Sequence, residues 1–143
     1  MIKSASIYKK GNKYVIHSYS ITEMGLSISS EPYFILEDNP TVEEICKCII
    51  SSLSQSEYNV KHPTDWKIQT RLLFENMQEK SIKALHTNNA ISCDITEEDE
   101  NITLYPMINL GAKEGFMLIP NCKFTFPKEE LEDNIYIGLN LCK

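Results

Sequence analysis

The chain has 143 residues, of which 42% are hydrophobic and 24% are charged, and its formal net charge is −6. This length and apolar content suit one compact domain over residues 1–143 and exclude wholesale disorder. No apolar stretch approaches the roughly 18 residues needed to cross a bilayer. The chain has 14 basic and 20 acidic residues, and this excess of negative charge disfavours a nucleic-acid partner.

The cysteines and the first residues indicate a reducing compartment. Five cysteines are an odd number, which makes a poor disulfide framework, and no histidine clusters with them as in a zinc site. Residues 1–5 lack the apolar run of a secretory signal. We therefore expect a cytoplasmic protein with reduced cysteines and no bound metal.

The first part of the chain has the alternation of β-strands. Gly11 and Asn12 supply turn chemistry between the first two strands, which predicts a hairpin. Pro32 cannot donate to a ladder, so we expect it at a strand start or on an edge strand. The predicted strands are residues 4–9, 14–21, 26–29 and 33–37.

A helix is predicted next. Thr41 and Glu44 have the spacing of a capping box, and the apolar stripe that follows is Val42, Ile45, Cys46, Ile49, Ile50 and Leu53. We expect this helix to pack on the preceding sheet. A polar loop over 51–63 then leads to a second short helix, capped by Thr64 and carrying Trp66, Leu72, Leu73 and Met77.

The second half repeats this order. Residues 82–86 and 91–95 are predicted to pair as strands across an Asn88–Asn89 turn, and further strands are predicted at 102–110, 116–120 and 121–126. A final helix over 128–141 buries Leu131, Ile135 and Leu139. The order of strands, helix, strands, helix predicts an α+β fold, in which an antiparallel sheet of about two strand groups packs with two or three helices.

No catalytic motif is found. The five glycines form no phosphate-binding loop, so no cofactor is expected. Cys93 and His86 are the one nucleophile and base that a single hairpin could bring together, but their registers do not match. We expect a protein that is not an enzyme, and a small hydrolase that uses this pair remains a weaker hypothesis.

Two acidic runs are the candidate binding residues. A solvated loop would account for the first run, and the helix dipole would account for the second, but each could also bind Lys or Arg of a basic protein. The candidate residues are Glu97, Glu98, Asp99, Glu100, Glu129, Glu130, Glu132 and Asp133.

Six segments within the first 55 residues carry a resemblance to a known family: Gly11–Val15, Ser18–Ser20, Gly25–Leu26, Ser30–Pro32, Phe34–Leu36 and Pro40–Ile45. In these segments the chain resembles bacterial contact-dependent growth inhibition immunity proteins. It implies a cytoplasmic protein, a monomer or weak dimer, that binds and blocks the C-terminal toxin domain delivered by a neighbouring cell. Many such toxins are basic nucleases, which an acidic inhibitor would meet rapidly.

A second hypothesis is a domain that binds single-stranded nucleic acid across its β-sheet. Such domains combine aromatic platforms with a basic groove. The seven tyrosines are spread along the chain with few interleaved basic residues, so we expect a protein partner and neither nucleic acid nor a membrane.

Overall fold

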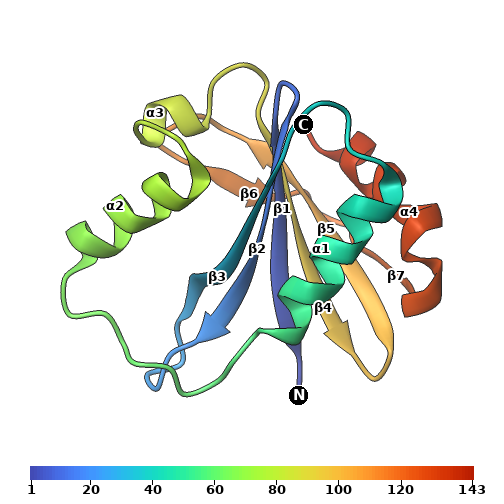
Figure 1. The fold of residues 1–143 in the computed structure, drawn as a ribbon, viewed down its shortest axis with the longest axis horizontal. Coiled ribbons are helices and arrows are strands. Elements are labelled where there is room, and N and C mark those ends of the chain that lie inside the picture. The colour runs from blue at the N-terminus through green and yellow to red at the C-terminus, as the bar shows by residue number, and fades with distance from the viewer.

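A computed structural model describes all 143 residues and confirms an α+β fold (Figure 1). One antiparallel sheet carries helices on both faces. The elements are β1 (Lys3–Lys10), β2 (Lys13–Ile21), β3 (Ser27–Leu36), α1 (Val42–Ser54), α2 (Trp66–Met77), α3 (Ile82–Leu85), β4 (Ile91–Glu98), β5 (Asn101–Asn109), β6 (Phe116–Leu118), β7 (Phe124–Pro127), a 3-10 turn η1 (Lys128–Glu130) and α4 (Leu131–Leu141).

The two predicted strand groups join in a single seven-stranded sheet. Its order is β3-β2-β1-β4-β5-β6, and β7 also pairs with β5. Strand β1 lies between β2 and β4, so Ser6 faces His17 on one side and Asp94 on the other. The centre of the sheet is therefore built by strands that are far apart in the sequence.

The predicted first hairpin is confirmed. Ile7 pairs with Ile16, and Gly11 has the positive φ of +59° that the turn requires. The two strands predicted at 26–29 and 33–37 are one strand, β3, whose register shifts opposite His17 and Ser18. Pro32 lies at this irregularity on the edge strand, as its missing N–H group predicts.

Helix α1 begins where the cap predicts. The Thr41 hydroxyl accepts a hydrogen bond from the Glu44 N–H group at 3.1 Å. Ile45, Ile49 and Leu53 are completely buried, and the helix packs on β1 and β2.

The prediction that Thr64 caps the second helix is wrong by one residue. The Asp65 carboxylate caps α2 and accepts from the N–H groups of Lys67 at 3.0 Å and Ile68 at 3.3 Å. A carboxylate also interacts favourably with the positive end of the helix dipole. Met77 is the one fully buried side chain of α2.

The strand predicted at 82–86 is wrong. Residues 82–85 form α3, a single helical turn that begins where the Ser81 hydroxyl accepts from the Ala84 N–H group at 3.1 Å. Asn88 and Asn89 do form a turn with positive φ, but it joins α3 to β4. The hairpin in this region is β4–β5, which turns at Asp99 and Glu100.

The last helix starts as the turn η1 and continues as α4. Its predicted buried row is confirmed, since Leu131, Ile135 and Leu139 are all buried. Gly138 lets α4 approach β5 closely, because a Cβ atom there would lie 2.7 Å from the Leu104 side chain.

The two faces of the sheet are covered unequally. Helices α1 and α4 enclose the main core on one face, whereas α2, α3 and β6 cover part of the other face with a smaller core (Figure 1). No helix is both long and apolar enough to cross a membrane. One sheet face thus carries the main core, and the other face is partly open.

We predict that Ile49→Ala in α1 lowers the free energy of unfolding by about 2–5 kcal/mol, because it leaves a cavity in the main core. Ile68→Ala in α2 is the matched control, since Ile68 is 45% exposed and its loss should change stability by less than about 0.5 kcal/mol. Urea unfolding measures both. Equal effects would contradict the assignment of the main core.

Candidate functional site

The fold brings the two predicted acidic runs together. Asn101 pairs with Pro127 where β5 meets β7, and the Lys128 N–H group donates to the Glu100 carbonyl at 2.9 Å. The β4–β5 turn therefore lies beside the start of α4. We call this region the acidic surface, which comprises Glu97, Glu98, Asp99, Glu100, Glu129, Glu130, Glu132 and Asp133.

Glu97 differs from the other members of the acidic surface. Its carboxylate lies 3.0 Å from the Lys128 ammonium group, and its side chain is only 13% exposed. The other seven carboxylates are exposed and have no ion-pair partner. Glu97 thus holds the two segments together, while the others are free to contact a partner.

A groove of about 400 Å³ extends the acidic surface towards α1. Cys46, Ile50 and Leu131 supply its apolar lining. Its charged lining residues are Glu43, Lys47, Lys128, Glu129 and Glu132. The sequence alone does not point to Glu43, because its position in this groove depends on how α1 and α4 pack.

The open face of the sheet carries a second feature. It is a row of five successive cross-strand neighbours that runs from β3 to β5 and consists of Tyr33, His17, Ser6, Asp94 and Tyr105. We call them the polar row. Cross-strand neighbours have Cβ atoms about 4.5–5.5 Å apart, so these side chains lie close together on one face.

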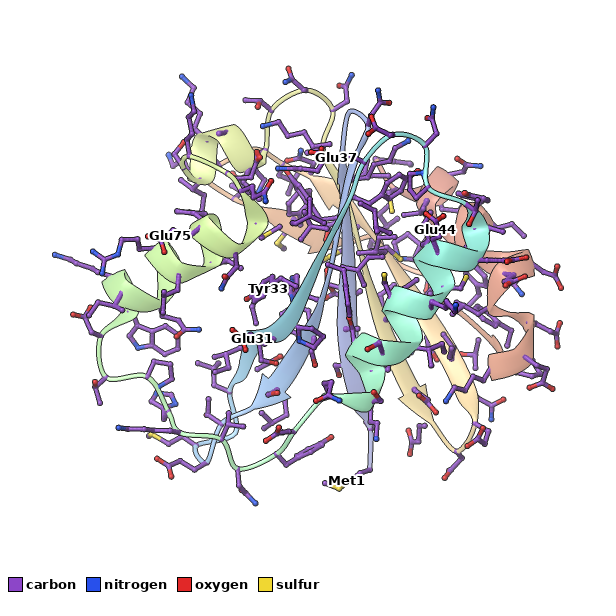
Figure 2. All side chains as sticks on the ribbon, viewed as in Figure 1. Met1, Glu31, Tyr33, Glu37, Glu44 and Glu75 are labelled. Carbon is purple, nitrogen blue, oxygen red and sulfur yellow. The ribbon has the colours of Figure 1, made fainter.

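The small core covers one end of this face. The neighbouring row, with Tyr8 and Val15, packs against Leu73 and Phe74 of α2. Figure 2 shows Tyr33 on the side of β3 that faces α2. The polar row thus borders the small core and continues towards the open end of the sheet.

His17 is neutral at physiological pH. It is 3% exposed and lies between the rings of Tyr19 and Tyr33, with centroid distances of 5.0 Å to each. Burial lowers the pKa of His17 to about 4. Its Nδ1 atom lies 2.9 Å from the Ser18 carbonyl, which can only accept, so Nδ1 carries the ring proton.

Asp94 is a carboxylate without a positively charged partner. Burial raises its pKa to about 6, although the adjacent Ser6 hydroxyl lowers it in part. Its Oδ1 atom is buried and has no hydrogen-bond partner. The three ion pairs of the chain do not include Asp94. The charged form of this side chain is therefore poorly solvated.

Cys93 and His86 do not form a catalytic pair. Cys93 is fully buried in the main core, and the thiol of Cys142 together with burial raises its pKa well above the usual range. His86 instead packs on Phe116 beside the small core, with a centroid distance of 4.6 Å. The hypothesis of a hydrolase that uses this pair is therefore not supported.

No family model matches the sequence, and no curated protein matches it. Two solved structures share the fold over 100% of this chain. One is a protein of unknown function from Neisseria meningitidis, at 16% identity and a TM-score of 0.79, with 96% of that chain covered. The other is a chain of the CdiA-CT/CdiI toxin and immunity complex from Yersinia pseudotuberculosis, at 14% identity and a TM-score of 0.76, with 98% covered. At these identities the likeness concerns the fold, which agrees with the resemblance found in the sequence.

We predict that Asp94→Asn stabilises the fold at about pH 8 by up to roughly 3 kcal/mol, because it removes a poorly solvated charge. The folded pKa of Asp94 is raised, so the cost of this charge is absent below about pH 4 and appears as the pH rises through about 6. Chemical unfolding at both pH values measures the effect.

Asp38→Asn is the matched control, since Asp38 is an exposed turn residue with a φ of 58°, which Asn tolerates. It should change stability little at either pH. A destabilised Asp94→Asn variant at about pH 8 would show that the carboxylate is well satisfied in the native protein.

Proposed function

We propose that this chain is the immunity protein of a contact-dependent growth inhibition system. It binds the cognate C-terminal toxin domain in the cytoplasm and neutralises it by stoichiometric protein–protein inhibition. The observation that carries the proposal is the whole-chain likeness in fold to a chain of a toxin and immunity complex. The sequence resemblance over the first 55 residues supports the same assignment.

The chemistry of the acidic surface favours a basic partner. Seven exposed carboxylates lie on two adjoining segments, whereas the whole chain has a net charge of only −6. Such a surface accelerates encounter with a positive surface and discriminates against negatively charged partners. A nuclease that binds a polyanion presents a positive surface of this kind, so we infer a basic nuclease toxin.

Inhibition in this proposal needs no chemical step. Carboxylates placed against the phosphate-binding residues of a nuclease would compete with its substrate. The apolar lining of the groove between α1 and α4 would add the buried contacts that give an interface most of its affinity. The acidic surface would mainly set the association rate and the specificity.

The nucleic-acid alternative has less support. The open sheet face does carry tyrosines, but the polar row holds no positive charge, since it contains no lysine or arginine and burial keeps His17 neutral. A phosphate backbone approaching Asp94 would meet repulsion, whereas single-strand binding normally depends on a positive groove.

We predict that the double variant Glu98→Lys and Glu129→Lys slows association with the cognate toxin domain that the proposed function requires by about tenfold at low salt. Each substitution reverses one exposed charge in one of the two segments. Stopped-flow association rates across a salt series measure the effect, and the salt dependence should become flatter.

The matched control is Glu37→Lys with Glu75→Lys. Both residues are exposed and lie away from the acidic surface (Figure 2), and either double variant changes the net charge from −6 to −2. Equal slowing by both would mean that overall charge, and not this surface, directs binding. If the toxin domain does not bind the unmodified chain, the proposed function itself is wrong.

A further inference from the structure

We propose that Asp94 and the Tyr105 ring form a receptor site on the open sheet face for one guanidinium group, supplied by an arginine side chain of the toxin. The source of this arginine rests on the proposed function. The site is separate from the acidic surface, which is formed by the β4–β5 turn and the start of α4.

The geometry places one carboxylate where a partner can reach it. Asp94 lies between Ser6 of β1 and Tyr105 of β5, and both Asp94 and Tyr105 are partly exposed. The Oδ1 atom makes no hydrogen bond. The terminal torsion of an aspartate is soft, so a small rotation can direct both carboxylate oxygens to an incoming group.

A cation is the group that this site lacks. An ionised carboxylate that is shielded from water and unpaired is costly until a positive donor reaches it. Lys10 and Lys13 lie on the same sheet face but are already held by Glu79, each at 2.5 Å. Lys123, the third lysine near this face, lies over the Tyr105 ring and forms no ion pair with Asp94. His17 is neutral, for the reason given above. The chain itself therefore leaves the charge of Asp94 unbalanced.

The aromatic neighbour favours a guanidinium over an ammonium group. The Lys123 ammonium group lies 5.9 Å from the centroid of the Tyr105 ring without forming an ion pair with Asp94, so this ring already accepts a cation over its face. A guanidinium can stack on such a ring while donating two parallel hydrogen bonds to a carboxylate. An ammonium group is not planar, so it can neither stack flat on the ring nor donate two parallel hydrogen bonds to the carboxylate.

The acidic surface and the Asp94 site would contribute to binding in different ways. The exposed acidic surface acts at a distance and raises the association rate, whereas a partly buried carboxylate–guanidinium pair acts at short range and slows dissociation. The stability cost of Asp94 in the free protein fits this division, because residues that lower local stability are characteristic of functional sites.

The test is a titration of the labelled protein with Nα-acetyl-arginine amide, followed by amide NMR shifts. We expect saturable shifts at Ser6, Asp94 and Tyr105, with Nα-acetyl-citrulline amide as the uncharged isostere that produces none. Asp94→Asn should weaken arginine binding by at least about tenfold, and Asp38→Asn should leave it unchanged. Equal shifts with both amides, or equal binding by Asp94→Asn, would overturn the receptor site.

A second arm separates this inference from the proposed function. With the toxin domain, Asp94→Asn should increase the dissociation rate by about tenfold and leave the association rate nearly unchanged. Unchanged dissociation would overturn the arginine contact while the proposed function stands. If the toxin domain does not bind at all but the arginine amide does, the receptor site stands and the proposed function fails.

Discussion

The packing of one sheet face against α1 and α4 to form the main core is the constraint on which the rest of this molecule depends. Ile7, Ile16 and Ile95 all point into this main core. Because side chains alternate along a strand, their neighbours in the sequence must lie on the other face. That face receives Ser6, His17 and Asp94, and α2, α3 and β6 cover only one end of it. The polar row is thus a direct consequence of how the core is formed.

The same sheet also determines where charge accumulates. Pairing of β5 with β7 carries the chain from the β4–β5 turn to the start of α4, and Lys128 fixes that junction through Glu97 and the Glu100 carbonyl. Exposed carboxylates from two distant segments therefore share one surface. A net charge of −6 spread evenly would steer a partner weakly, whereas concentration at one surface gives a directed field.

Local signals in the sequence were sufficient for elements whose contacts are local. The first hairpin, the Thr41 cap and the buried row of α4 follow from turn chemistry, capping and periodicity, and all three are confirmed. The strand predicted at 82–86 is wrong because alternation over five residues does not distinguish a strand from one helical turn. The contact between the acidic runs and the pairing of Ser6 with Asp94 depend on long-range strand order and register, which periodicity does not encode.

The proposal that one defined surface binds a basic protein can be tested by hydrogen–deuterium exchange of the chain, alone and mixed with the toxin domain that the proposed function assigns to it. We expect binding to slow amide exchange at 97–101 and 128–133 and to leave amide exchange in α2 unchanged. Protection confined to α2 and α3, with both acidic segments exchanging as in the free chain, would contradict it.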